Sequence, residues 1–286
     1  MSDAISTDSG TLLEGKVAVV TGAGSGIGAA TARLFAAHGA HVIIAEIDPE
    51  TAQRTADEIA EAGSTASVTV LDVREDEQVT AFANDVLAKH GAIDILINNV
   101  GHWLHIPSHF TKSDPKQWEE LYRINLHHVF TMTYAFLPSM IERGKGSIVN
   151  VASVEGMRGY PADPVYGAFK AAVVHFTKGL GVQIGHQGVR VNVIGPDLTE
   201  SVQAPYSKWI TPEEGEKWWP IWAPVGRVGE PIDQARVVLF LASDMSSFIT
   251  GHAIPTDGGS AAAGGWFRAP RRGSMRWTNR PYVAEG

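Results

Sequence analysis

The chain contains no cysteine in its 286 residues. This absence excludes disulfide bonds, a thiolate nucleophile and thiolate ligands for a metal ion. Any oxidation or reduction that the protein performs must therefore depend on a cofactor.

Long apolar runs and an excess of basic residues are also missing. The longest apolar stretches are pieces such as VAVV and VIIAEI, whereas a membrane-spanning helix needs about 20 residues. Residues 1–13 lack the basic start and apolar stretch of a signal peptide, and we expect them to be flexible. The formal net charge of -8 gives no attraction to nucleic acid or to an anionic membrane. These features predict a cytoplasmic protein that acts on a small molecule.

Short β-branched runs alternate along the chain with longer helical patterns, and 44% of the residues are hydrophobic, enough for a large core. The runs are KVAVVT, HVIIAEI, SVTVLDV, IDILINN, GSIVNVAS, VRVNVIG and a last strand near His252–Thr256. This order is typical of a parallel sheet with helices on both faces. The sequence therefore predicts an α/β Rossmann-type fold with a doubly wound, seven-stranded parallel sheet, in a single domain at residues 14–263.

A long helix is predicted between the fourth and fifth strands. Asp114 precedes Pro115, which suits a first helical turn, and Gln117 completes the spacing of a capping box. We expect this helix to run towards Met140.

The first strand leads directly into the glycine-rich run TGAGSGIG, which contains Gly22, Gly26 and Gly28. Glycine lets the backbone turn sharply and approach a pyrophosphate, and the helix that follows directs free N–H groups and a positive dipole end towards it. A plain turn from strand to helix is the alternative. The strand-loop-helix context favours a dinucleotide site.

Glu46 ends the second strand, where an acid can accept hydrogen bonds from the hydroxyls of an adenosine ribose. A carboxylate at this position repels a 2′-phosphate, and neither Ser25 nor Ile47 supplies a cation to offset the repulsion. The sequence therefore favours NAD over NADP, the alternative being an exposed glutamate at the end of a strand.

Tyr166 and Lys170 are four residues apart and share one face of a predicted helix, and Ser153 precedes the tyrosine by thirteen positions. A phenol has an unperturbed pKa of about 10. A nearby ammonium favours its ionised form. The tyrosine can then exchange a proton with a bound alcohol or ketone while a cofactor exchanges the hydride.

Several motifs together resemble the short-chain dehydrogenase/reductase family over about residues 14 to 260. They are TGAGSGIG, LDV (71–73), NNVG (98–101), INL (124–126), Ser153, YGAFK and TDGG (256–259). The resemblance implies a catalytic tetrad of Asn125, Ser153, Tyr166 and Lys170. It further implies cofactor contacts from Gly22, Ser25, Gly26, Ile27, Gly28, Glu46, Asp72, Val73, Asn99, Val100, Gly101, Tyr166, Lys170, Pro196, Thr199 and Ser201.

The resemblance also assigns a role to each member of the tetrad. Tyr166 donates or accepts the proton, while Lys170 lowers the pKa of the phenol and binds the nicotinamide ribose. Ser153 holds the substrate oxygen. Asn125 helps to hold a water through which protons reach the lysine.

Two positions depart from the family pattern. Val100 stands where alanine is usual, a small apolar change. Asp197 stands after Pro196 where glycine is usual. Its carboxylate either stabilises an oxidised nicotinamide or faces solvent, and we expect the second.

The segment at about 197–229 corresponds to the substrate lid of the family and is rich in aromatic residues. Aromatic side chains bury large apolar areas. They favour a bulky apolar alcohol or ketone, although packing of the lid or a subunit interface would also explain them. The candidate pocket residues are His102, Trp103, Tyr160, Tyr206 and Trp209.

His102, His105 and His109 have a helix-like metal spacing, but Pro107 interrupts it and no carboxylate accompanies them. We expect no metal site. The tail at 264–286 carries Trp266, Trp277 and Tyr282 among several arginines. We expect it to be ordered against a neighbouring subunit, and the family resemblance implies a homotetramer.

Three functions compete. The first is an NAD-dependent dehydrogenase for a bulky secondary alcohol of the steroid, terpene or aryl class. The second is a 3-oxoacyl thioester reductase, which would favour NADPH. The third is a non-catalytic NAD sensor or scaffold, against which the complete tetrad argues.

Overall fold

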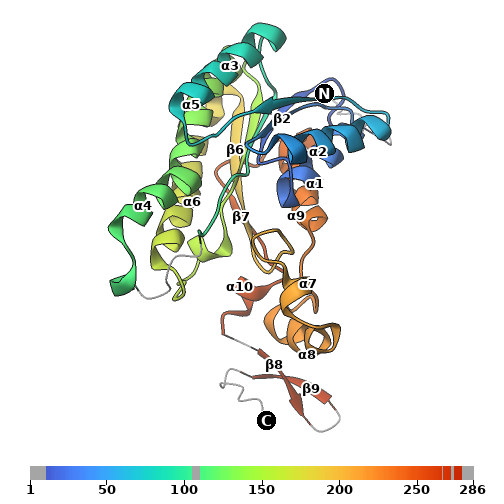
Figure 1. The fold of residues 1–286 in the computed structure, drawn as a ribbon, viewed down its shortest axis with the longest axis vertical. Helices are drawn as coiled ribbons and strands as arrows, with labels where there is room; N and C mark the ends of the chain where they lie inside the picture. Colours follow the sequence, from blue (N-terminus) through green and yellow to red (C-terminus); the bar gives the residue numbers. More distant parts are fainter. Residues whose placement is uncertain (1–10, 105–109, 266, 272–273, 279–286) are drawn as a thin grey trace.

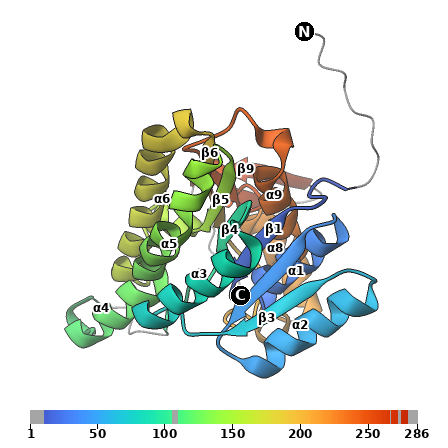
Figure 2. The same cartoon turned by 90° about the horizontal axis from the view of Figure 1, so that it is seen from above.

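A seven-stranded parallel sheet forms the centre of the molecule (Figures 1 and 2). The structure is a computed structural model that describes residues 11–104, 110–265, 267–271 and 274–278. The strand order is β3-β2-β1-β4-β5-β6-β7. This confirms the predicted doubly wound fold. The strands are β1 (Val17–Thr21), β2 (His41–Glu46), β3 (Ala66–Val70), β4 (Ile95–Asn98), β5 (Gly146–Val151), β6 (Val189–Pro196) and β7 (Ala253–Thr256).

Helices cover both faces of the sheet, as Figure 2 shows. Successive residues of a strand point to opposite faces, so Val20 packs in the core beneath α1 and α9 while Val19 packs beneath α3 and α5. The major helices are α1 (Gly26–Ala37), α2 (Pro49–Glu61), α3 (Asp76–His90), α4 (Pro115–Tyr122), α5 (His128–Glu142), α6 (Pro164–Ile184) and α9 (Pro231–Ala242). None in the described ranges is long and apolar enough to cross a membrane.

The helix predicted after Asp114 starts as expected, with the capping box of Asp114 and Gln117 formed. It is not one regular α-helix, however, because a π-helical turn at Arg123–His127 separates α4 from α5. The side chain of Asn125 donates to Leu121 O at 3.0 Å and to His102 O at 2.8 Å. A π turn inserts an extra residue and is frequent at functional sites, and this one directs Asn125 towards the loop after β4.

The lid segment extends from the end of β6 as two short helices, α7 (Tyr206–Trp209) and α8 (Pro212–Trp222). Thr211 and Glu214 form a second capping box at the start of α8. After β7 the chain forms α10 (Ser260–Ala263) and then an antiparallel ribbon of β8 (Phe267–Arg271) and β9 (Ser274–Thr278), which lies beside α8 (Figure 1). Among the predicted features, residues 1–10, His105, His109, Trp266, Arg272, Arg280 and Tyr282 lie outside the described residues.

Candidate active site

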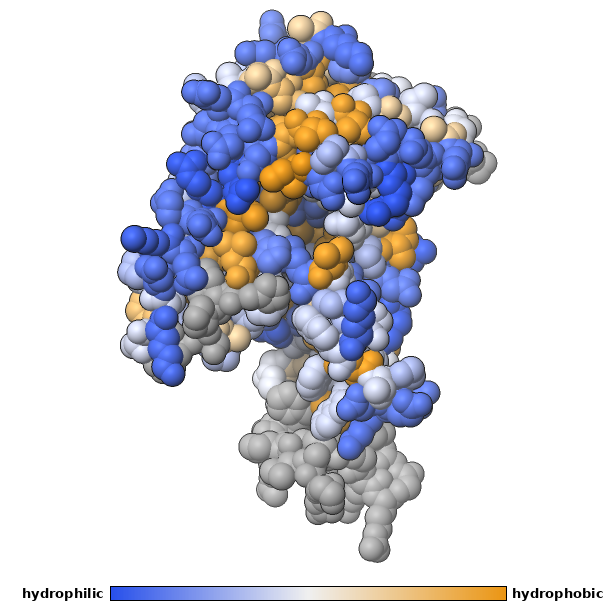
Figure 3. All heavy atoms as spheres, in the orientation of Figure 1, coloured by the Kyte–Doolittle hydropathy of each residue, from blue (hydrophilic) through white to orange (hydrophobic). Residues whose placement is uncertain are grey.

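A cleft of about 560 Å³ opens at the carboxyl ends of the parallel strands. In a doubly wound sheet, ligands bind at this edge where the strand order reverses. On the face seen in Figure 3, apolar side chains form a band down the middle of the body between polar helix surfaces. All five predicted pocket residues line the cleft: His102, Trp103, Tyr160, Tyr206 and Trp209.

The glycine loop forms one wall of the cleft. Gly22 and Gly26 have φ angles of 64° and 53°, a region that favours glycine. A Cβ atom at Gly28 would collide with the carbonyl oxygen of Gly22. The sequence therefore needs glycine at these positions to bring the loop this close to α1.

The N-terminus of α1 is open to an anion. Ser25 occupies the N-cap, and within the described residues its side chain makes no capping hydrogen bond and the first turn holds no acid. Free N–H groups and the positive end of the helix dipole suit a phosphate group. The loop and helix therefore fit the pyrophosphate of a dinucleotide.

The carboxylate of Glu46, at the end of β2, is held by three backbone N–H groups. One carboxylate oxygen accepts from Gly24 N at 2.9 Å, and the other accepts from Ile47 N at 2.8 Å and Asp48 N at 3.3 Å. These three backbone donors fix the negative charge beside the glycine loop. The carboxylate lines the cleft, where it can accept hydrogen bonds from ribose hydroxyls.

Arg74 is a cleft residue that the sequence reasoning missed. It lies next to Asp72 and Val73, both of which also line the cleft. Its guanidinium contacts Asp72 at 2.6 Å, and this pairing lowers the pKa of Asp72. Asp72 thus accepts from Nε and one terminal nitrogen of Arg74 and offsets its positive charge.

The loop after β4 is attached to the first strand. Asn99 N donates to Thr21 Oγ1 at 2.9 Å, while its side chain donates to the carbonyls of Thr21 and Gly22 at 3.0 and 3.3 Å. Asn99, Val100 and Gly101 all line the cleft. The bonds of Asn99 attach this wall of the cleft to β1.

The structure brings the side chains of Ser153, Tyr166 and Lys170 to the same wall of the cleft. Ser153 follows β5, and α6 begins after Asp163, whose carboxylate accepts from Val165 N and Tyr166 N. The ammonium of Lys170 lies 5.7 Å from the centre of the Tyr166 ring. The cap of α6 therefore positions the tyrosine, and helix periodicity places the lysine beneath it.

Burial shifts the pKa values of both groups. It raises the pKa of Tyr166, which hydrogen bonding to Ser153 opposes, and it lowers the pKa of Lys170 to about 8. The expected net lowering of the tyrosine pKa is therefore not found. Desolvation of the phenolate outweighs the hydrogen bond.

Asn125 and Lys170 approach the same glycine. A Cβ atom at Gly101 would lie 2.5 Å from Lys170 Nζ and 3.1 Å from Asn125 Oδ1. Asn125 Oδ1 also accepts from His102 N at 3.0 Å, and Lys170 donates to Val151 O at 3.2 Å. A larger residue than glycine would fill the space between the asparagine and the lysine.

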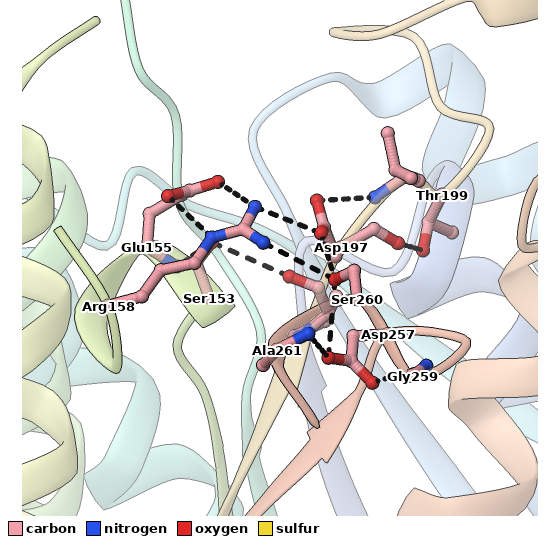
Figure 4. A network of polar contacts seen from close by, with 11 residues as sticks. Ser153, Glu155, Arg158, Asp197, Thr199, Asp257, Gly259, Ser260 and Ala261 are labelled. Atoms are coloured by element: carbon pink, nitrogen blue, oxygen red, sulfur yellow. Dashed lines mark hydrogen bonds and ion pairs between the residues drawn. The ribbon is translucent and has the colours of Figure 1, made fainter. Parts of the chain in front are cut away.

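The side chain of Asp197 is less exposed than predicted. Its side chain is only 11% exposed and accepts from Arg158 at 3.0 Å and from Ser260 Oγ at 2.5 Å (Figure 4). Its other oxygen accepts from Leu198 N at 2.9 Å. The expectation of a solvent-facing carboxylate was wrong because two distant segments supply partners that sequence spacing does not reveal.

Other predicted residues also line the cleft. Ser25, Ile27, Pro196, Thr199 and Ser201 do so. The lining residues that were not predicted include Gln203, which donates to Gly101 O at 2.7 Å, and Glu155. Glu155 lies two residues after Ser153, and this closeness in sequence could have indicated that it lines the cleft.

Of the three histidines with a helix-like metal spacing, only His102 lies within the described residues. In that part of the chain, no group of three or more histidine and acidic side chains could hold a metal ion.

A family profile described as enoyl-(acyl carrier protein) reductase matches residues 22–261. This match includes every residue that lines the cleft, and it decides the family. The chain belongs to the short-chain dehydrogenase/reductase family. It is 38% identical over 247 residues to a 3-oxoacyl-acyl-carrier-protein reductase of Thermotoga maritima, covering 86% of this chain and 98% of that protein. The protein is therefore an oxidoreductase of this family.

Solved structures agree with this assignment. A protein of Burkholderia xenovorans described as a short-chain dehydrogenase/reductase has a TM-score of 0.82 and 34% identity, covering 88% of this chain and 98% of that one. Levodione reductase has a TM-score of 0.81 and 31% identity, with coverage of 88% and 99%. Members of the short-chain dehydrogenase/reductase family use a nicotinamide dinucleotide, and the glycine loop and α1 fit that group.

Proposed function

We propose that this short-chain dehydrogenase/reductase interconverts a bulky apolar secondary alcohol and its ketone, with NAD as the cofactor. The observation that carries the proposal is a single cleft with Glu46 and the glycine loop at one end and Ser153, Tyr166 and Lys170 at the other. Steroid, terpene and aryl alcohols are the candidate substrates.

The residues of the cleft divide the chemistry among them. Ser153 Oγ accepts from Glu155 N at 3.1 Å and makes only a long donor bond, of 3.5 Å, to Pro196 O, so its hydroxyl can turn to donate to a substrate oxygen. Tyr166 gives its proton to that oxygen during reduction and takes it back during oxidation. Lys170 holds a positive charge beside the phenol. A bound nicotinamide would supply the hydride or accept it.

Aromatic residues support an apolar substrate. Tyr206 packs edge-on against Trp209 and Trp219, with ring centres 5.7 and 5.6 Å apart, and Tyr206 and Trp209 line the cleft. Trp103 lines it from the loop after β4. Oxidation of a panel of secondary alcohols, with NAD and NADP side by side, tests the proposal. Failure to oxidise any bulky member of the panel would argue against the proposed substrate class.

Glu46 is expected to set the cofactor preference. We predict that kcat/KM with NAD exceeds that with NADP at least tenfold, equivalent to about 1.4 kcal/mol, because the fixed carboxylate repels a 2′-phosphate. Glu46→Ala should reduce the ratio. Glu50→Ala, which removes an exposed acid from the first turn of α2, is the matched control. Equal use of both cofactors by the unmodified protein would contradict the assignment.

A 3-oxoacyl thioester reductase is the second candidate, favoured by the identity to the Thermotoga maritima reductase. This enzyme would reduce an acetoacetyl thioester with NADPH. Assay of that thioester beside the alcohol panel separates the two functions. A non-catalytic sensor has less support, because the side chains for proton transfer are assembled beside the cleft.

We further propose that the C-terminal ribbon packs on a second subunit of a homotetramer. A two-stranded ribbon alone is marginally stable in water, and β8 and β9 lie at the end of the molecule beside α8 (Figure 1). Deletion of all residues after Gly264 should weaken the oligomer in sedimentation experiments or raise KM for bulky substrates. NAD affinity should change little. Unchanged assembly and kinetics, with a tail that is cleaved as fast as an unfolded peptide, would contradict this prediction.

A further inference from the structure

An ion-pair cluster stands at the catalytic end of the cleft. Arg158 contacts Glu155 at 2.7 Å and Asp197 at 3.0 Å, so one guanidinium joins the loop after β5 to the end of β6 (Figure 4). Ser260 contributes its hydroxyl to Asp197. The cluster formally contains two negative charges and one positive charge, and one negative charge is in excess.

The excess negative charge is on the cleft side of the cluster. Glu155 and Asp197 line the cleft, whereas Arg158 is not among its described lining residues. The two carboxylates are 14% and 11% exposed. Their partial burial limits screening by solvent, so charges here act more strongly than on an open surface.

The lining cations do not neutralise this charge. In the part of the chain that the structure describes, the lysine and arginine residues that line the cleft are Arg74 and Lys170. Arg74 is paired with Asp72 near the glycine loop. Lys170 is only 2% exposed and lies beneath Tyr166. A ligand group next to Glu155 and Asp197 therefore meets carboxylates rather than an available cation.

The field of the two carboxylates reaches the pocket tyrosines. Burial raises the pKa of Tyr206 to about 12, and Asp197 and Glu155 contribute to the rise. Burial likewise raises the pKa of Tyr160, with Glu155 and Asp197 adding to the effect and Arg158 opposing it. Negative charge on a ligand at the same place would be disfavoured for the same reason.

We propose that Glu155 and Asp197, held by Arg158, make the active site reject substrates that carry a carboxylate near the reacting alcohol. This inference rests on the proposed function, because it defines which secondary alcohols enter the same site. It makes Glu155 and Asp197 specificity-determining residues. Neutral alcohols and ketones pass this wall, and their acidic analogues do not.

A matched pair of substrates tests the proposal: mandelate, whose carboxylate is bonded to the carbinol carbon, and its methyl ester. In the unmodified protein, kcat/KM for the ester should exceed that for the acid at least tenfold. Asp197→Asn should reduce the ratio. The combination of Glu155→Gln and Asp197→Asn changes the formal charge of the cluster from -1 to +1, and it should bring the ratio to one or reverse it.

The matched control is Glu58→Gln. Glu58 forms an ion pair with Arg33 at 2.6 Å on the exposed surface of α1 and α2, outside the cleft. This variant removes one carboxylate from the protein but should keep the ratio of the unmodified enzyme. The single Asp197→Asn variant keeps the test usable if the double variant does not fold.

Equal turnover of ester and acid by the unmodified protein, or an unchanged ratio in correctly folded variants, would overturn the proposal. Failure of the proposed function is a different result, in which neither alcohol is oxidised. In that case the corresponding ketones are compared as ligands by thermal shift in the presence of NAD. Stabilisation by the neutral ketone alone supports charge rejection, and any other binding pattern counts against it.

Discussion

Tyr166→Phe should lower kcat for the best secondary alcohol by about 10²- to 10⁴-fold, the range for loss of a general acid or base. The substitution removes the oxygen that exchanges a proton with the substrate but keeps the ring that packs near Tyr160, 6.3 Å away between ring centres. NAD affinity should remain close to that of the unmodified protein. Steady-state kinetics and NAD titration by fluorescence measure the two effects separately.

Tyr134→Phe is the matched control for this experiment. Tyr134 lies on α5 and is 83% exposed, so loss of its hydroxyl should leave kcat unchanged. Near-wild-type turnover by Tyr166→Phe would show that another group transfers the proton.

Local sequence signals were sufficient to predict the sheet. Strands such as β1 and β2 are short β-branched runs that are buried on both faces, and each of them precedes a helical pattern. Asp114 with Pro115 predicted the start of α4 because capping depends on residues within one turn. Features that depend on neighbours in sequence could therefore be predicted from the sequence alone.

The π-helical turn at Arg123–His127 could not be predicted from local sequence signals. A regular helical pattern continues through Asn125, but in the structure its side chain bonds to Leu121 and to His102 in the loop after β4. That loop is 23 residues away in sequence from Asn125. Contacts of this kind depend on the tertiary structure, and no spacing of residues along the sequence indicates them.

The same limit applies to Asp197. Its partners come from the loop after β5 and from α10, and the next residue, Leu198, has a φ of 38° that is uncommon for leucine. The bond from Leu198 N to the Asp197 side chain supports this conformation at the start of the lid. The sequence marked Asp197 as unusual, but only the fold shows that it connects the lid to the catalytic loop.

The pKa of Tyr166 is a third example. The spacing of Tyr166 and Lys170 correctly placed an ammonium near the phenol, but the direction of the shift depends on burial. Desolvation opposes the charged form of both groups. A sequence gives the order of charged residues along a helix, but it does not give how deeply each of them is buried from solvent.

Lys170→Met should nearly abolish turnover and at the same time stabilise the cofactor-free protein at pH 7. Burial lowers the pKa of Lys170 to about 8, so the folded protein holds this ammonium less favourably than the unfolded chain does. The difference from the unfolded value of about 10.4 corresponds to about 3 kcal/mol. Loss of the hydrogen bond to Val151 O offsets about 1 kcal/mol of the gain.

The pH dependence identifies the cause of this gain. Between pH of about 8 and about 10.4 the unfolded state binds more protons at Lys170 than the folded state, so the unmodified protein becomes more stable as pH rises through this window. The advantage of Lys170→Met in thermal unfolding should therefore be full at pH 7 and small at pH 10. Lys178→Met, at an exposed position of the same helix, should show no such dependence. A lower melting temperature for Lys170→Met at pH 7, or a difference in melting temperature that does not change with pH, would show that the buried ammonium does not destabilise the folded protein. The expected result instead means that the fold tolerates a destabilising charge at this position because proton transfer requires it.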